Sequence, residues 1–474
     1  MEIGLVERQQ RSKISVMSHF IDKAFIPALA ACIFGTTLQA ESLVVGAPPF
    51  LRAQDGDTIV FLGDSITHQS LYTQYVEDFF YTRYPDRKIH FHNAGVSGDK
   101  AADALARFDD DVAAFEPDFV TILLGMNDGR YEPYNDETFG IYRDDMTEIL
   151  ELVAKTGAET IALSPTMFDH HQLALRQNDP DFRFNNREFF PQYNSLMGYY
   201  SGWLRGAVGE QQSPFVNFWG PLNDITSAAR LQQPDFTLVE DAIHPGAAGQ
   251  FIMAFTILAA AQPERRGVSS VAISQRGGKW IAPKKAGVTD LVVSEAADSV
   301  AFTHLAKALP WVVPAESSEY DLKWGKSSPA ALGYELTKAG HKLSGERLRI
   351  QGLAPGEYEL TIDDENITRF THSALAAGVE LQKYPQTPQS RQALEVALLN
   401  RERNDKAVRP TRDLWSKVKG LRNRLDAEKF AAEYPELKTQ IHALNKSADD
   451  YETRIYDAAQ PRPRRYQLNR FLTK

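Results

Sequence analysis

The stretch that decides the fold is Thr58-Ile-Val-Phe-Leu-Gly-Asp-Ser-Ile-Thr67, a short apolar run that ends in Gly63-Asp64-Ser65. An apolar run of this length, rich in β-branched and aromatic residues and bounded by a polar turn, is typical of a buried strand. A helical pattern begins directly after the turn. The order strand, turn, helix predicts the start of a βαβ unit, with Ser65 at the carboxyl end of a strand.

The same alternation continues to about residue 260. The predicted strands are Thr58–Leu62, Lys88–His92, Phe119–Leu124, Thr160–Ser164 and Phe215–Phe218. Helical patterns follow them at about residues 66–83, 100–115, 137–156, 191–208 and 245–261. Strands that alternate with helices predict an α/β fold with a parallel sheet, which we assign to residues 52–263.

The remainder of the chain divides by composition into two regions. Residues 266–370 are rich in Val, Thr, Gly and Ser and are expected to form a small β-rich accessory region, with a hairpin over residues 348–362. Residues 373–474 carry charged helical patterns broken by prolines and are expected to form a helical C-terminal region with mostly solvated charges.

Composition excludes several classes of protein. With 474 residues, 43% hydrophobic and 24% charged, the chain has the make-up of a folded globular protein of more than one unit. The 52 Lys and Arg against 62 Asp and Glu give a formal net charge of -10, so no nucleic-acid partner is expected. The single cysteine, Cys32, excludes an internal disulfide and a Cys-rich zinc site.

The N-terminal stretch has the pattern of an export signal. An apolar run over residues 24–40 follows Lys23 and ends in a small residue before Glu41. We expect residues 1–40 to be a signal peptide and the protein to be periplasmic or secreted. A lipid anchor on Cys32 is a second possibility, and no later segment is apolar and long enough to be expected to span a membrane.

Four stretches carry groups suited to catalysis. They are Gly63–Ser65, Asn93–Gly98, Gly125–Asp128 and Asp241–His244. The first three follow predicted strands, and because the carboxyl ends of parallel strands meet at one edge of a sheet, we expect them to lie close together. The fourth places a carboxylate three residues before an imidazole, a spacing that a turn can bring into contact.

Together these stretches supply the groups that ester hydrolysis requires. The reaction needs a nucleophile, a base, a carboxylate that orients the base, and donors for the oxyanion. Ser65, His244 and Asp241 are the predicted catalytic residues, and Gly95 and Asn127 are predicted oxyanion donors.

The four stretches resemble, in order and spacing, the conserved blocks of the SGNH hydrolases, also called the GDSL esterase/lipase family. The resemblance covers about residues 55–262, and Ile66 stands where the name of the family expects Leu. It implies a flavodoxin-like three-layer αβα sandwich with a five-stranded parallel sheet. It also implies that the backbone N–H of Ser65 joins Gly95 and Asn127 in the oxyanion hole. No cofactor or metal is expected, because the sequence offers no convincing set of ligands for one.

The resulting prediction is an exported serine esterase that removes short acyl groups, above all acetyl, from a small-molecule or polysaccharide ester. A lysophospholipase or broad carboxylesterase of the same family would carry the same residues, as would an acyl transferase. A non-catalytic carbohydrate or cell-surface binding protein and a metal-dependent phosphoesterase are further alternatives. Adjacent Asp169, His170 and His171 are a weak metal candidate and are interpreted as a polar loop at the substrate rim. The oligomeric state is left open.

Overall fold

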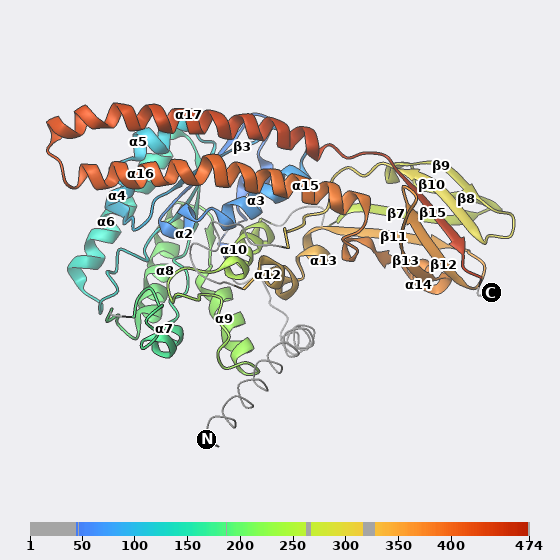
Figure 1. Ribbon diagram of the computed structural model, residues 1–474, viewed down its shortest axis with the longest axis horizontal. Helices are drawn as coiled ribbons and strands as arrows, with labels where there is room; N and C mark the ends of the chain where they lie inside the picture. Colours follow the sequence, from blue (N-terminus) through green and yellow to red (C-terminus); the bar gives the residue numbers. More distant parts are fainter. Residues whose placement is uncertain (1–43, 46, 186, 262–266, 316–327, 473–474) are drawn as a thin grey trace, which may run out of the picture.

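The computed structural model describes residues 44–45, 47–185, 187–261, 267–315 and 328–472. The expected signal peptide, residues 1–40, and Cys32 lie outside the described residues. The molecule is elongated, with an α/β unit at one end and a β-sandwich at the other, and a pair of long helices runs along the α/β unit toward the sandwich (Figure 1). None of the helices in the described parts of the chain is long and apolar enough to cross a membrane.

The α/β unit is built on a six-stranded sheet with the strand order β1-β6-β5-β4-β2-β3. Strands β2 to β6 pair in parallel, and their order is the flavodoxin-like one in which the chain changes direction between β2 and β4. The strands are β1 (Val44–Val45), β2 (Thr58–Gly63), β3 (His90–Gly95), β4 (Phe119–Leu123), β5 (Glu159–Leu163) and β6 (Phe215–Val216).

The predicted α/β fold is therefore confirmed, with one correction to the sheet. The five parallel strands are joined by β1, which pairs antiparallel with β6 at the edge. A strand of two residues is too short to produce a period-2 pattern, which is why the sequence pattern did not reveal it.

Helices cover both faces of this sheet, because its central strands are apolar on both sides. Ile59 and Phe61 of β2 pack into one core, and Val60 and Leu62 pack into another. The first face is covered by α3 (Leu71–Arg83), α9 (Trp219–Arg230) and α10 (Ala247–Ala260). The second is covered by α4 (Ala101–Leu105), α6 (Asp136–Thr156) and α8 (Tyr193–Glu210). The result is the expected three-layer αβα arrangement.

The β-sandwich consists of a four-stranded sheet, β14-β11-β7-β8, and a five-stranded sheet, β13-β12-β15-β10-β9. Its strands are β7 (Gly267–Arg276), β8 (Lys279–Ile281), β9 (Val288–Val293), β10 (Ser299–His304), β11 (Gly345–Gln351), β12 (Glu357–Ile362), β13 (Glu365–Thr371), β14 (Val379–Glu380) and β15 (Arg464–Arg470). The inward residues of the two sheets share one apolar core.

The hairpin expected over residues 348–362 is wrong. β11 pairs with β7 and β14, whereas β12 pairs with β13 and β15 in the other sheet. Ile350 of β11 and Leu360 of β12 face each other's sheet across the common core. Both strands alternate apolar and polar residues as hairpin strands do, and that alternation does not distinguish pairing within one sheet from packing between two.

A helical hairpin over residues 388–459 forms the third part of the molecule. It consists of α15 (Pro388–Arg403), a π-helical turn η6 (Asn404–Val408), α16 (Arg409–Arg422) and the antiparallel α17 (Ala427–Ala459). The side chains of Thr387 and Asp426 cap the two arms by accepting hydrogen bonds from backbone N–H groups of the first turn.

The two accessory regions are less separate than expected. Residues 373–474 are not helical throughout, because the chain returns after α17 to form β15 between β10 and β12. The β-rich region 266–370 in turn contains α12 (Ala330–Thr337) and α13 (Ala339–Leu343). The shorter elements are η2 (Pro49–Arg52), α2 (Ser65–His68), α5 (Phe108–Asp111), η3 (Ala113–Phe115), α7 (His170–Arg176), η4 (Lys284–Ala286), α14 (His372–Ala377) and η5 (Leu381–Lys383).

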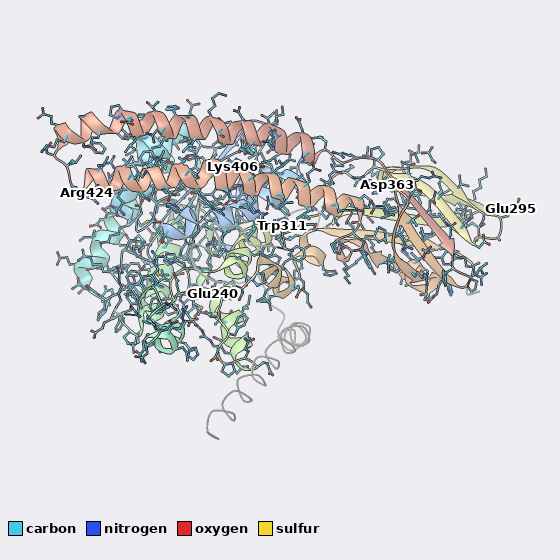
Figure 2. All side chains as sticks on the ribbon, in the orientation of Figure 1. Glu240, Glu295, Trp311, Asp363, Lys406 and Arg424 are labelled. Carbon is cyan, nitrogen blue, oxygen red and sulfur yellow. The ribbon has the colours of Figure 1, made fainter. Side chains whose placement is uncertain are left out.

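A buried tryptophan joins the β-sandwich segment to the α/β unit. The Trp311 ring stacks on Phe251 of α10, with ring centroids 4.7 Å apart, and meets the edge of Phe79 of α3. Figure 2 shows Trp311 near the middle of the molecule, while Glu295 marks the tip of the sandwich and Arg424 the tip of the helical hairpin. This packing holds the segment after β10 against two helices of the α/β unit.

Buried ion pairs join the helical hairpin to the α/β unit. Arg403, which is 1% exposed, pairs with Glu77 of α3 at 3.3 Å and with Glu452 of α17 at 2.9 Å. It also donates a hydrogen bond to the backbone oxygen of Phe91 in β3. The guanidinium thus holds two helices and the edge strand of the sheet.

We predict that Arg403→Met lowers the free energy of unfolding by about 3–5 kcal/mol, because Glu77 and Glu452 would remain buried without their cation. Chemical denaturation followed by circular dichroism measures the change. The control is Arg143→Met, which removes an exposed pair with Asp144 and is expected to change the free energy by less than about 1 kcal/mol. Equal effects of the two variants would contradict this account.

Candidate active site

The structure brings Ser65, His244 and Asp241 into one hydrogen-bonded chain. Ser65 is the first residue of α2, directly after β2, and its Oγ lies 2.8 Å from Nε2 of His244. Nδ1 of the same imidazole lies 2.7 Å from Oδ2 of Asp241. With the proton on Nδ1, the ring donates to the carboxylate and Nε2 accepts the serine hydroxyl, as a nucleophile and its base require.

The side chain of Asp241 holds the turn that joins Asp241 to His244. Oδ1 of Asp241 accepts hydrogen bonds from the backbone N–H of Ile243 at 3.0 Å and of His244 at 2.7 Å. Ala242 adopts a left-handed conformation, with φ of 75°. Burial favours the neutral acid, but His244 and these hydrogen bonds outweigh it and lower the pKa of Asp241, which therefore stays a carboxylate.

Gly95 lies at the expected edge, but its amide is not open to a ligand. The backbone N–H of Gly95 donates to Oδ1 of Asn93 at 2.9 Å. A Cβ built on Gly95 would lie 2.3 Å from the backbone nitrogen of His68, so this glycine is needed for the close packing of α2 on β3. The prediction of Gly95 as an oxyanion donor is therefore corrected to a packing role.

The next glycine of the loop fits a donor better. Gly98 is exposed, has φ of 73°, and its amide has no hydrogen-bond partner among the described residues. Because both glycines lie in the same short stretch, the sequence alone could not tell which amide is free.

Asn127 follows β4 and lies at the same edge of the sheet. Both polar atoms of its side-chain amide make hydrogen bonds. Nδ2 donates to the backbone oxygen of Asp99 at 3.0 Å, and Oδ1 accepts from the hydroxyl of Tyr131 at 2.9 Å. Tyr131 and its neighbour Arg130 both adopt left-handed φ values, 62° and 57°. Such backbone strain is concentrated at functional sites, and here it brings the tyrosine hydroxyl back to Asn127.

Two buried carboxyl groups flank the site. Burial raises the pKa of Asp64 to about 7, although its Oδ1 accepts the N–H of Ile66 as the cap of α2. Burial and the charge of Asp64 raise the pKa of Asp128 to about 7. Oδ1 of Asp128 accepts the N–H of Ala101. Both groups therefore act as structural acceptors that gain a proton more readily than ordinary aspartates.

The weak metal candidate has a structural explanation. Asp169 caps α7, pairs with Arg230 at 2.6 Å and accepts a hydrogen bond from Thr237. In the described parts of the chain, no group of three His, Cys, Asp or Glu side chains is arranged to hold a metal ion.

Known proteins resemble the α/β unit that carries these residues. The model of the GDSL-like Lipase/Acylhydrolase family matches residues 61–251. An acetylxylan esterase of Geobacillus stearothermophilus is 26% identical over an alignment of 227 residues, and the match covers 44% of this chain and 95% of that protein.

The α/β unit of this chain, matched over residues 61–251, belongs to the SGNH hydrolase family.

As a member of this family it is a carboxylic ester hydrolase, and solved structures extend the likeness beyond the α/β unit. A gut microbial diltiazem-metabolizing enzyme aligns with 88% of this chain and 98% of its own, with a TM-score of 0.73 and 23% identity. The fold of this SGNH hydrolase, accessory parts included, is thus shared with that enzyme. The crystal structure of the acetylxylan esterase Axe2 of Geobacillus stearothermophilus aligns with 44% of this chain and 96% of its own, with a TM-score of 0.35 and 23% identity.

Besides Gly98, Tyr131 is a residue of this SGNH site that the sequence did not reveal, because nothing in the sequence indicated its contact with Asn127. It had no signal beyond its position four residues after Asn127, since an aromatic residue after a strand is usually part of the core. Its ring does pack on Phe189 and Tyr193, but its hydroxyl leaves that cluster to reach Asn127.

We predict that Tyr131→Phe lowers kcat for an ester substrate about 10-fold with little change in KM. The loss of the hydroxyl frees Oδ1 of Asn127, so Nδ2 is held less well toward the oxyanion, while the donor itself remains. Steady-state kinetics measures the effect. Tyr134→Phe is the matched control, because that exposed hydroxyl of the same loop bonds Asp136 and Tyr199, neither of which belongs to the site described above. A kcat equal to that of the control variant would refute the role of Tyr131.

We predict that the stability of Asp128→Asn, compared with that of wild type, is more favourable at pH 8 than at pH 5. The folded-state pKa of about 7 lies above the value of an exposed aspartate, so the contribution of this group is fully present below about pH 4 and is lost as the pH rises through 7. An asparagine has no such loss. Thermal unfolding at pH 5 and pH 8 measures the difference between variant and wild type, which is expected to shift in favour of the variant at pH 8.

The control for this experiment is Asp144→Asn, which removes one negative charge from an exposed position. Its difference from wild type is expected to be nearly the same at both pH values. If Asp128→Asn behaves like this control, the carboxyl of Asp128 is ionised in the folded protein at both pH values.

Proposed function

We propose that this SGNH hydrolase is an exported serine esterase that removes short acyl groups, above all acetyl, from carbohydrate. The observation that carries the proposal is the hydrogen-bonded chain of Ser65, His244 and Asp241 at the carboxyl edge of the sheet, with contacts of 2.8 and 2.7 Å. Open α/β sheets bind ligands at this edge, next to the point where the strand order changes direction.

The proposed reaction has two acyl-transfer steps. Nε2 of His244 takes the proton of the Ser65 hydroxyl while Oγ attacks the acyl carbon. The tetrahedral oxyanion accepts hydrogen bonds from the backbone N–H groups of Ser65 and Gly98 and from Nδ2 of Asn127. The bond to the alcohol then breaks, and the alcohol leaves with the proton from Nε2.

Water completes the cycle by the same route. His244 takes a proton from the water, whose oxygen attacks the acyl carbon, and the second oxyanion is held by the same donors. When the bond to Oγ breaks, Ser65 recovers the proton from Nε2 and the carboxylic acid is released. Asp241 remains a carboxylate throughout and stabilises the imidazolium.

Three observations support a small acyl group on a polar substrate. Ser65 is 6% exposed and His244 is 8% exposed, so little room is open directly at the nucleophile. The curated relative with 26% identity is an acetylxylan esterase. The apolar stretch over residues 24–40 has the pattern of an export signal, and polymeric carbohydrate is an extracellular substrate.

We predict that the hydrolysis rate of nitrophenyl esters falls steeply as the acyl chain lengthens from acetyl to dodecanoyl, and that Ser65→Ala abolishes the activity. The variant removes the nucleophile and with it the covalent route. The measurement is kcat/KM for each ester with both proteins, followed by release of acetate from acetylated xylan.

Three other outcomes would change the proposal in different ways. A maximum at long acyl chains would make the protein a lipid esterase. Equal rates for wild type and Ser65→Ala would contradict the serine mechanism on these substrates. Hydrolysis of nitrophenyl acetate without release of acetate from acetylated xylan would remove this polysaccharide as substrate while leaving the esterase in place.

A further inference from the structure

Helix α16 of the helical hairpin lies against the loop that follows β3, which we call the donor loop, residues 96–99. Val96 of this loop is fully buried in an apolar cluster with Leu414, Trp415 and Val418 of α16. The cluster joins residues more than 300 positions apart in the chain, so a distant accessory helix forms part of the support of the active-site edge.

Asp413 of α16 reaches the loop through a histidine of α2. The Nε2 atom of His68 lies 3.3 Å from Oδ1 of Asp413. Its Nδ1 atom accepts hydrogen bonds from the backbone N–H of Ser97 at 3.3 Å and from the Ser97 hydroxyl at 3.2 Å. A carboxylate at Nε2 favours the proton on that nitrogen, which leaves Nδ1 as the acceptor that Ser97 requires.

Lys419, six residues further along α16, holds the other side of the loop. Its Nζ atom lies 2.9 Å from Oδ1 of Asp99 and 3.0 Å from Oδ2 of Asp103. The ammonium passes beside Gly98, since a Cβ built on that glycine would lie 3.9 Å from Nζ. The Asp99 carboxylate also accepts a hydrogen bond from Arg107, so the loop is clamped between a cation of the α/β unit and one of α16.

Both proposed oxyanion donors beyond Ser65 depend on where this loop lies. Gly98 is one of its residues, and Asn127 donates to the backbone oxygen of Asp99 at 3.0 Å. A shift of the loop therefore moves the Gly98 amide and the Asn127 side chain together. Displacements of about 1 Å at such donors can lower turnover roughly 100-fold.

We propose that Asp413 and Lys419 are positioning residues that hold the oxyanion donors of the esterase from the accessory helix. The inference rests on the proposed function and adds to it that the helical hairpin is required for turnover. Neither side chain touches substrate or the reacting atoms in this account. Each acts through the donor loop.

The test compares kcat and KM for nitrophenyl acetate in full-length variants. Lys419→Met removes the cation at similar side-chain length, and Asp413→Asn removes the carboxylate charge. The matched control is Lys438→Met, which removes an ion pair of the same hairpin with Asp110 and touches no residue of the donor loop. Asp413 is half exposed, so Asp413→Asn is expected to keep the wild-type denaturation midpoint. Because the partner of Lys419, Asp99, is buried, the denaturation midpoint of Lys419→Met is measured as well, and all kinetics are recorded under conditions in which each variant is fully folded.

We expect kcat to fall about 10- to 100-fold in Lys419→Met and at least several-fold in Asp413→Asn, with KM within about twofold of wild type. Lys438→Met should keep the wild-type kcat. Lys419→Arg, which keeps the charge, should recover much of the lost kcat.

Several outcomes would overturn the inference. They are turnover in Lys419→Met and Asp413→Asn equal to that of Lys438→Met, a rise of KM without a fall of kcat, or no recovery in Lys419→Arg. Failure of the proposed function has a different signature, because wild type would then show no acetate ester hydrolysis that Ser65→Ala abolishes.

Discussion

The site depends on three parallel strands that end level with one another. Gly63 of β2 is in register with Gly95 of β3 and with Leu123 of β4. At both glycines α2 comes too close for a side chain, since a Cβ on Gly63 would lie 2.1 Å from Oγ1 of Thr67. This close approach fixes the first turn of α2, and with it the direction in which Ser65 points. The donor loop and Asn127 start from the neighbouring strand ends and so converge on the same place.

Much of the α/β unit could be predicted, because the sequence patterns that indicate its strands and its site residues are each confined to a few neighbouring residues. Each buried strand is a short apolar run, and Ser65, Asn127, Asp241 and His244 each lie in a compact polar stretch next to such a run or a helix start. The choice between Gly95 and Gly98 could not be made from the sequence, because it depends on whether Asn93 occupies the amide. The accessory regions were predicted less well, since alternation in two strands does not show whether they pair or face each other.

The charges of the helical hairpin illustrate a second limit of sequence analysis. Composition favoured a solvated face, yet Arg403, Arg409 and Arg412 are each about 1% exposed or less. Arg412 binds both carboxylate oxygens of Asp111, at 2.7 and 3.0 Å, and the neighbouring cations hold the pKa of Asp111 below its usual range despite burial. A buried arginine and an exposed one look alike in a sequence until the partner carboxylate is known, and here Glu77 lies 326 residues from Arg403 and Asp111 lies 301 residues from Arg412.

Strand β15 has a consequence for how the protein is made. It is formed by residues 464–470 yet occupies the middle of the five-stranded sheet, with β12 on one side and β10 on the other. That sheet therefore cannot close until residues 464–470 have left the ribosome, whereas all five parallel strands of the α/β unit are synthesised by residue 216. A chain without residues 464–470 would have two open strand edges in this sheet, at β10 and at β12, which favour aggregation.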